Sequence, residues 1–340
     1  MREVFPFGNK GYPEMAIIVT GAAGFIGFHV SQALLARGEQ VIGIDCVNDY
    51  YDPSLKEARL AQLMANPSFA FHRIDISDKD RMFALAEGLG DVSGIVHLAA
   101  QAGVRYSLEN PYTYITSNVM GHVVVLEMAR LLRDKGLKHV VYASSSSVYG
   151  GNTKLPFSVE DAVETPVSLY AATKRTDELI SHTYAHLYGL PQTGLRFFTV
   201  YGPWGRPDMA AYLFANAIVS GRKLPVFNNG NMKRDFTYVD DIVAGILLAL
   251  DKPSEEKVPH RVFNLGQGNP VDLMGYISAI EKALGRKAEL EMKPMQPGDV
   301  PATYADIEFS RAVLGYEPKV PVSDGIPRFI EWYKDYYKVS

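Results

Sequence analysis

The amino-acid sequence predicts an α/β protein built on a doubly wound parallel sheet, with a smaller lobe toward the C-terminus. Three features predict this class: short uninterrupted apolar runs, helical patterns between them, and a glycine-rich turn after the first run. Strands that are apolar on both sides are typical of parallel sheets covered by helices on both faces. Right-handed crossovers between successive strands then give a doubly wound arrangement.

The elements can be placed in order along the chain. We expect residues 1–14, which hold glycines and prolines without a period, to form a flexible lead-in. A helix is predicted at 25–37, and strands are predicted at residues 16–19, 41–44, 69–74, 94–98 and 139–143. Beyond about residue 201, prolines and glycines separate shorter elements. We therefore expect a cofactor-binding domain over 15–200, completed by elements from about 237–270, and a mainly substrate-binding lobe over 201–340.

The composition excludes several classes of protein. The 340 residues are 47% hydrophobic and 21% charged, as in soluble globular chains, and the net charge of −4 argues against nucleic acid or an anionic membrane as the main partner. We find no apolar run near the ~20 residues that cross a bilayer, and no secretory signal. The single Cys46 excludes a disulfide framework, and His182 and His186 lack the glutamate of a zinc-protease motif. We expect a cytoplasmic enzyme or ligand-binding protein without a metal.

The glycine-rich turn is the first candidate binding site. Its seven residues are Gly21, Ala22, Ala23, Gly24, Phe25, Ile26 and Gly27, between a predicted strand and a predicted helix. Glycines there allow a tight turn and let the backbone approach a pyrophosphate, while the helix N-terminus offers N–H groups and partial positive charge. Asp45 ends the second strand, 18 residues after Gly27. A carboxylate there can hold ribose hydroxyls and repel a 2′-phosphate, so the sequence predicts NAD in a Rossmann-type domain. The alternative is a tight turn without a ligand.

Two later strands end in residues that can meet the same cofactor. Asp75 and Ile76 follow the third strand, where an acid can reach the adenine. Leu98, Ala99 and Ala100 follow the fourth, and small residues let the chain pass close to the cofactor. The two alanines are equally compatible with ordinary packing.

A group of reactive side chains follows the fifth strand. Ser144 to Ser147 leave its carboxyl end, where ligands bind in open α/β sheets. Tyr170 and Lys174 lie downstream at positions i and i+4, on one face of a predicted helix. The lysine ammonium favours the phenolate form of the tyrosine, which makes Tyr170 a candidate general acid/base. Such a pair occurs by chance in many helices, but here it accompanies a cofactor turn and a serine cluster.

The glycine spacing and these segments resemble the extended short-chain dehydrogenase/reductase family over residues 15–337. The resemblance implies that Ser145, Tyr170 and Lys174 are catalytic, that Ser146 and Ser147 line the same pocket, and that Asn48 and Asn118 also bind the cofactor. The dehydratases of the family carry Asp-Glu after the catalytic hydroxyl, and the decarboxylases usually carry Glu. This chain has serines there, so elimination lacks its proton donor.

Four longer segments, residues 48–56, 100–107, 166–174 and 196–209, are similar to those of nucleotide-uronate 4-epimerases. This resemblance implies NAD-dependent 4-epimerisation of UDP-glucuronate to UDP-galacturonate through a 4-keto sugar, with hydride returned to the opposite face and NAD kept bound. Two alternatives stay open within the fold, a UDP-glucuronate decarboxylase and a neutral-sugar 4-epimerase. A third is an NAD-binding regulator without activity, which would typically lack the tyrosine–lysine pair.

The resemblance also suggests residues for the UDP-sugar. The 4-keto uronate is a β-keto acid that loses carbon dioxide easily, so its carboxylate must be held, and the candidate donors are Arg105, Ser146, Ser147, Thr199 and Arg206. Arg234 resembles the pyrophosphate-binding arginine of the family, while Asp299 and Phe227 could meet the uridine ribose and the uracil. The competing interpretations are a phosphate contact for Arg105, a loop salt bridge for Arg206, an Arg234–Asp235 surface pair, a turn aspartate and a core aromatic. Helical stretches at 112–133 and 168–188 resemble those that form the homodimer interface in this family.

Overall fold

The structure is a computed structural model that describes residues 15–295 and 300–339, so the predicted lead-in at 1–14 lies outside the described residues. Its contacts divide the chain into two compact units. Unit 1 takes the chain up to Val148 together with Ser168–Leu195 and Ile246–Val262. Unit 2 takes Tyr149–Val167, Arg196–Gly245 and the chain from Phe263 onward. These boundaries differ from the predicted domain boundaries, most clearly in grouping residues 149–167 with unit 2.

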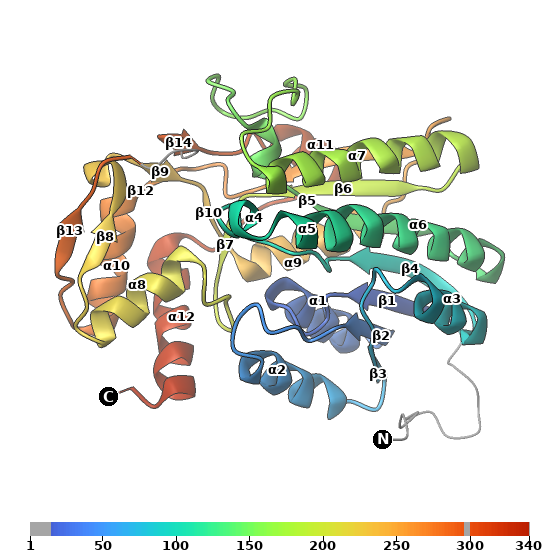
Figure 1. Cartoon of the computed structure of the whole chain (residues 1–340), viewed down its shortest axis with the longest axis horizontal. Coiled ribbons are helices and arrows are strands. Elements are labelled where there is room, and N and C mark those ends of the chain that lie inside the picture. The colour runs from blue at the N-terminus through green and yellow to red at the C-terminus, as the bar shows by residue number, and fades with distance from the viewer. Residues whose placement is uncertain (1–14, 296–299, 340) are drawn as a thin grey trace. The chain divides into compact units, whose positions relative to one another are not determined.

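A seven-stranded sheet with the order β11-β6-β5-β4-β1-β2-β3 confirms the predicted fold class (Figure 1). The printed pairs β1–β2, β2–β3, β1–β4 and β4–β5 are all parallel. The strand order reverses direction at β1, as in a doubly wound sheet. The strands span Ala16–Thr20 (β1), Gln40–Asp45 (β2), Phe69–Arg73 (β3), Val92–His97 (β4), His139–Ser145 (β5), Gln192–Phe197 (β6) and His260–Leu265 (β11).

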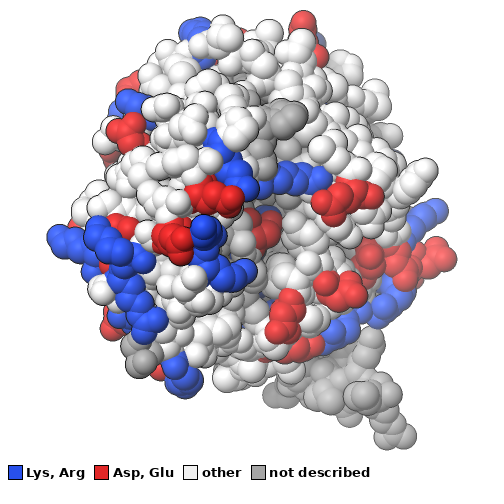
Figure 2. Space-filling model, turned by 60° about the vertical axis from the view of Figure 1, so that its left-hand side comes forward, with Lys and Arg blue, Asp and Glu red and all other residues white. Residues whose placement is uncertain are grey.

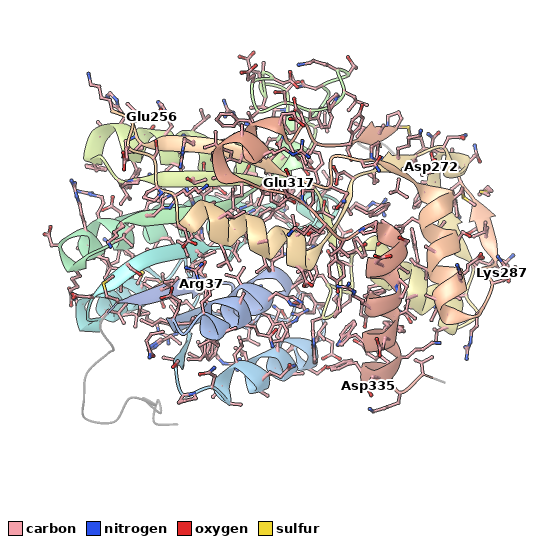
Figure 3. The ribbon with its side chains drawn as sticks, turned by 180° about the vertical axis from the view of Figure 1, so that it is seen from behind. Arg37, Glu256, Asp272, Lys287, Glu317 and Asp335 are labelled. Carbon is pink, nitrogen blue, oxygen red and sulfur yellow. The ribbon has the colours of Figure 1, made fainter. Side chains whose placement is uncertain are left out.

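Helices cover the sheet in unit 1. On one face α3, α6 and α7 pack against one another, and α1 and α2 pack together on the other (Figures 1 and 3). The core between α3, α6 and the strands is aliphatic, with Ile18, Ile95 and Leu126 fully buried. The bounds of these helices are Phe25–Ala36 (α1), Ser54–Met64 (α2), Lys79–Gly88 (α3), Tyr106–Glu109 (α4), Pro111–Tyr114 (α5), Gly121–Leu132 (α6) and Leu169–Tyr188 (α7), with a π-helical turn at Ile115–Met120 (η1) and 3₁₀ turns at Arg133–Lys135 (η2) and Ser146–Tyr149 (η3).

Side-chain caps fix the ends of two of these helices. The Ser168 side chain accepts the N–H of Ala171 at the start of α7, and Gly189 ends that helix in the left-handed region at φ 60°. Asp78 caps α3 in the same way by accepting the N–H of Arg81. Figure 3 shows Arg37 just after the end of α1, where its guanidinium pairs with Asp251 at 2.9 Å.

Within the part of the chain that the structure describes, one helical run is long and apolar enough to cross a membrane, judged by length and composition alone. The run is Pro111–Lys135, which is 25 residues long. The sequence analysis did not identify it as an apolar run of that length. Half of its apolar window is buried inside the protein, and α6, its main part, packs against α3 and α7. The core helix of a soluble protein meets the same criterion.

Unit 2 holds three small sheets and its own apolar core. The sheets pair β7 with β10, β8 with β13, and β12 with β9 and β14. Leu224 and Val226 of β8 and Ile277 of α10 belong to one buried cluster, and the ring centroids of Phe236 and Tyr276 stack at 3.6 Å. The strands are Thr199–Tyr201 (β7), Leu224–Val226 (β8), Lys233–Arg234 (β9), Phe236–Tyr238 (β10), Val271–Asp272 (β12), Leu290–Met292 (β13) and Ala302–Thr303 (β14).

The helical elements of unit 2 are Ala210–Val219 (α8), Phe227–Gly230 (η4), Leu273–Leu284 (α10), Glu308–Leu314 (α11) and Val322–Tyr337 (α12), and α9 spans Val239–Leu250 at the boundary of the two units. Asp272 immediately precedes α10 and Lys287 follows it (Figure 3). Acidic and basic side chains are mixed over the face shown in Figure 2, in keeping with the small net charge of −4.

Candidate active site

The glycine-rich turn connects β1 to α1 and leaves no room for a side chain at Gly21 or Gly27. Gly21 has φ +72°, and a Cβ built on it would lie 2.8 Å from the backbone nitrogen of Ala99. A Cβ on Gly27 would lie only 2.0 Å from the Gly21 carbonyl oxygen. Gly24 is the N-cap of α1, and no side chain among the described residues caps that helix end. The close backbone packing and the uncapped N-terminus fit a dinucleotide pyrophosphate.

Asp45 ends β2 next to this turn. It is buried, and its two carboxylate oxygens accept the N–H groups of Val47 at 2.7 Å and Ala23 at 3.1 Å. Burial raises the pKa of the Asp45 carboxyl, while the nearby cations of Lys56 and Arg59 act in the opposite direction. The carboxylate therefore sits where the sequence predicts the ribose acceptor, tied to the turn itself through Ala23.

The structure adds two cations that the sequence analysis did not single out for this site. Arg59 on α2 is completely buried and donates to the carbonyl of Ala23 at 2.9 Å and to the hydroxyl of Tyr51 at 2.8 Å. Lys56, one turn earlier, donates to the carbonyl of Asn48 at 2.8 Å. Arg59 thus stabilises the cofactor turn through its hydrogen bond to the Ala23 carbonyl. Along the sequence both residues look like surface charges of an amphipathic helix, and only their tertiary contacts reveal their burial.

Five more of the predicted cofactor residues follow β3 and β4 closely in the chain. The Asp75 carboxylate accepts the N–H and hydroxyl of Ser77, and Ile76 is buried beside it. The N–H groups of Leu98 and Ala99 donate to the hydroxyl of Thr20, which fixes the path of the chain through Ala100 beside the glycine turn.

Asn118 lies in the π-helical turn η1 and is almost fully buried. Its amide oxygen accepts the N–H of Gln101, and its amide nitrogen donates to the Gln101 carbonyl and the Thr173 hydroxyl. Both amide hydrogens are therefore used within the protein. Asn118 ties the chain after β4 to α7, and its direct contact with a cofactor stays a prediction.

Ser145 ends β5 in unit 1, Lys174 on α7 reaches that end of the strand, and Tyr170 lies one turn before Lys174 on the same helix. Lys174 Nζ donates to the carbonyl of Ala143 at 3.0 Å, which fastens α7 to β5 two residues before Ser145. Ser145 Oγ donates to Ser147 Oγ and accepts the Ser147 N–H, both at 3.1 Å. Tyr170 is half-buried in the first turn of α7, with its ring edge-on to that of Tyr114. A hydroxyl, a phenol and an ammonium at one strand end provide a general acid/base with a polarising partner.

The two residues after Ser145 are serines, whereas a dehydratase needs carboxyl groups at these positions. Ser146 and Ser147 begin the 3₁₀ turn η3 and are partly exposed. Ser147 already exchanges two hydrogen bonds with Ser145, so only part of its hydrogen-bonding capacity is left for a ligand. Arg105, also in unit 1, is exposed at the N-cap of α4.

The predicted substrate residues of unit 2 have varied surroundings. Arg206 pairs with Asp208 at 3.0 Å, which is the loop salt bridge given above as its alternative. Thr199 starts β7 half-buried, and its N–H donates to the carbonyl of Asp235. Phe227 begins η4, packed against the small core. The predicted ribose contact at residue 299 lies outside the described residues.

Arg234 on β9 is not in the surface pair with Asp235 that was one interpretation of the sequence. Its guanidinium donates to the carbonyls of Lys233 at 2.8 Å and Pro301 at 3.2 Å. Asp235 is fully buried and accepts hydrogen bonds from the Thr237 hydroxyl and from the backbone N–H groups of Gln267, Gly268 and Ala305. The aspartate therefore holds the backbone around β9, and the arginine projects from a fixed strand.

Comparison with known proteins identifies relatives along almost the whole chain. Residues 17–266 match the model of the NAD dependent epimerase/dehydratase family. UDP-glucuronate 4-epimerase 4 of Arabidopsis thaliana is 47% identical over 336 residues, which cover 95% of this chain and 76% of the relative.

Two solved structures have the same fold. The UDP-glucuronic acid 4-epimerase of Bacillus cereus, in complex with UDP-glucuronic acid and NAD, is 35% identical with a TM-score of 0.87, covering 95% of this chain and 100% of the other. The UDP-glucose 4-epimerase of Thermotoga maritima, solved with UDP-glucose, is 30% identical with a TM-score of 0.84 and the same coverage.

Proposed function

This chain belongs to the NAD-dependent epimerase/dehydratase family, and on that premise we propose that it is an isomerase that converts UDP-glucuronate to UDP-galacturonate with NAD as a tightly bound cofactor. The observation that carries the proposal is the arrangement of Tyr170, Lys174 and Ser145 at the carboxyl end of β5. The relatives named for this reaction, and the neighbour that holds UDP-glucuronic acid and NAD, support the same assignment.

In the proposed reaction, Tyr170 takes the proton of the C4 hydroxyl. The hydroxyl hydrogen of Ser145, which points to Ser147 Oγ here, turns to the same oxygen and donates a hydrogen bond to it. Lys174 stabilises the phenolate of Tyr170 and holds the cofactor ribose. NAD, when bound, supplies a reversible acceptor for the C4 hydride. The 4-keto sugar then presents its other face, and Tyr170 returns the proton to the oxygen as C4 is reduced with inverted configuration. The glycine turn, Asp45 and the chain around Ala99 are the residues that would hold the dinucleotide.

Two features of the site favour retention of the sugar carboxylate: there is no acid at the two positions after Ser145, and hydrogen-bond donors are available to hold the carboxylate. Positions 146 and 147 are serines, so no acid stands there to protonate a leaving group or the product of decarboxylation. We assign the carboxylate to donors among Arg105, Ser146, Ser147, Thr199 and Arg206, the diphosphate to Arg234, and the uridine to Phe227 and Asp299. Among these, Arg206 is already paired with Asp208, which leaves less of its guanidinium for a substrate.

We expect the purified protein, incubated with UDP-glucuronate, to produce UDP-galacturonate without loss of carbon. NMR of the sugar nucleotides resolves this product from its alternatives. UDP-xylose would identify a decarboxylase, and turnover of UDP-glucose in preference to UDP-glucuronate would identify a neutral-sugar 4-epimerase. Absence of turnover by protein that contains NAD would favour a regulator, and each of these three results would overturn the proposal.

We further propose that the enzyme is a homodimer. The segment from α4 to η1 exposes large apolar side chains, including Leu108 at 76% and Tyr112 at 82% exposure, and α7 exposes Leu179 and Leu187. The double substitution Tyr112→Glu and Leu179→Glu should lower the solution mass from dimer to monomer, as measured by light scattering. Met64→Glu, at an apolar residue on α2 whose 62% exposure lies between those of Leu179 and Tyr112, is the control and should leave the mass unchanged. A parent protein of monomeric mass would contradict the proposal.

A further inference from the structure

The charged side chain of Lys174 is almost completely buried. The residue is 4% exposed, and its ammonium donates to the Ala143 carbonyl at 3.0 Å and to Asp177 Oδ2 at 3.1 Å. An ammonium has three hydrogens, so these two bonds leave one for the cofactor ribose or the Tyr170 hydroxyl. The lysine is therefore held from behind by a strand carbonyl and by one carboxylate, three residues further along the same helix.

Asp177 is an unusual residue to find in that position. It is 1% exposed, and its second oxygen, Oδ1, has no hydrogen-bond partner within the described part of the chain. A buried carboxylate oxygen without a partner destabilises a fold, and an apolar pair of similar volume is often at least as stable as a buried ion pair. The Lys174–Asp177 pair is therefore poorly explained by packing alone, and its contact with the proposed catalytic lysine suggests a functional reason.

We propose that Asp177 is a positioning residue, whose carboxylate holds the Lys174 ammonium in place beside β5 and opposes its charge. A lysine–aspartate pair, and not an isolated lysine, then sets how readily Tyr170 releases its proton. The inference rests on the roles that the proposed function gives to Tyr170 and Lys174.

The other ionisable groups around Asp177 do not replace it. Glu178, its neighbour on α7, is engaged by Ser144 at 2.6 Å and Arg175 at 2.9 Å. His122 on α6 lies near, and it stacks on His97 of β4. Burial lowers the pKa of His97 to about 3 and that of His122 well below its usual value, so both imidazoles are neutral at physiological pH.

Burial also raises the pKa of Asp177 to about 6, an effect that the Lys174 charge opposes and the Glu178 charge reinforces. Above that pH the carboxylate offsets the lysine charge, and below it the ammonium acts alone. A Lys174 ammonium whose charge is offset by a neighbouring carboxylate stabilises the Tyr170 phenolate less than an ammonium without such a neighbour.

The test compares the pH dependence of kcat/KM in the parent and in Asp177→Asn, which keeps the shape and removes the charge. We expect the acidic limb of the profile to move to lower pH by about one unit, because a neutral side chain leaves the Lys174 charge unopposed. Asp177→Ser, with a smaller neutral side chain, should show the same shift if the asparagine variant folds poorly. The near-ultraviolet absorbance of tyrosinate, taken as the difference with and without an added Tyr170→Phe change, should move in the same direction without any turnover.

Glu178→Gln is the matched control. It removes a buried carboxylate one residue away that does not bond to Lys174 and that acts on Asp177 only through its charge. Its acidic limb should therefore move much less than that of Asp177→Asn. If the Asp177 variants kept the limb and the tyrosinate titration of the parent, while Tyr170→Phe was inactive, Asp177 would be structural only and the proposed function would stand. An active Tyr170→Phe enzyme would instead remove the proposed function itself.

Discussion

Tyr170→Phe should lower kcat by about 10²–10⁴-fold, the usual contribution of a positioned general acid/base. The substitution removes only the phenolic oxygen, which takes the C4 proton in the proposed reaction. The ring and its edge-on contact with Tyr114 remain, so the fold and the bound NAD should be retained. Turnover measured by NMR, together with the NAD content and the thermal unfolding of the purified variant, checks this expectation.

Tyr184→Phe provides the comparison on the same helix. Its hydroxyl donates to Glu127 at 2.6 Å and belongs to no part of the proposed site. This variant should turn over at a rate close to that of the parent, even if the lost hydrogen bond lowers its stability by about 1 kcal/mol. Equal rates for Tyr170→Phe and the parent would show that the phenol is not the acid/base.

Gly27→Ala should abolish cofactor retention. It should also lower the free energy of unfolding by about 1–3 kcal/mol, as overpacking of a tight site does. The added Cβ would lie 2.0 Å from the Gly21 carbonyl oxygen, and both groups are backbone-fixed, so the turn itself must move. A displaced turn withdraws the N–H groups of α1 from the pyrophosphate. The NAD content of the purified protein and its urea unfolding curve measure the two effects.

Gly88→Ala is the matched glycine control. Gly88 ends α3, and a Cβ added there would meet no atom within 4 Å. We expect full NAD content and a stability that is unchanged or raised by up to about 1 kcal/mol, since alanine favours helix. A Gly27→Ala protein that retained as much NAD as the parent would mean that the cofactor does not lie on this turn.

The strands that the sequence predicts are those whose own residues are apolar enough to indicate burial. The runs at β1, β2, β4 and β5 are almost wholly apolar, and they pair in parallel as expected. β6 was not predicted, because Gln192 and Thr193 open a strand whose every residue is buried. Gln192 donates to the Ser181 carbonyl, and Thr193 pairs with His139, so distant partners satisfy polar groups that would otherwise indicate a loop.

The candidate site divides in the same way. The glycine turn, Asp45 and the Tyr170–Lys174 pair follow from short-range spacing, because each motif fits a strand end or a helix face next to it in sequence. Arg59 and Asp177 do not follow from spacing, since a charge on a helix is ordinarily a solvated one. Only contacts with the glycine turn, for Arg59, and the packing of α7 on β5, for Asp177, bury these charges. The same holds for Asn118, whose π-helical turn has no signature that we could find in the sequence.

In the proposed reaction, C4 of the sugar is oxidised and then reduced again without release of the intermediate, and Tyr170 handles only the oxygen-bound proton. The measurement that tests it most directly uses UDP-glucuronate with deuterium at C4, converted by the enzyme in ordinary water. The account predicts UDP-galacturonate that keeps its deuterium at C4, because the hydride never exchanges with solvent. Product that carries solvent hydrogen at C4 would contradict it.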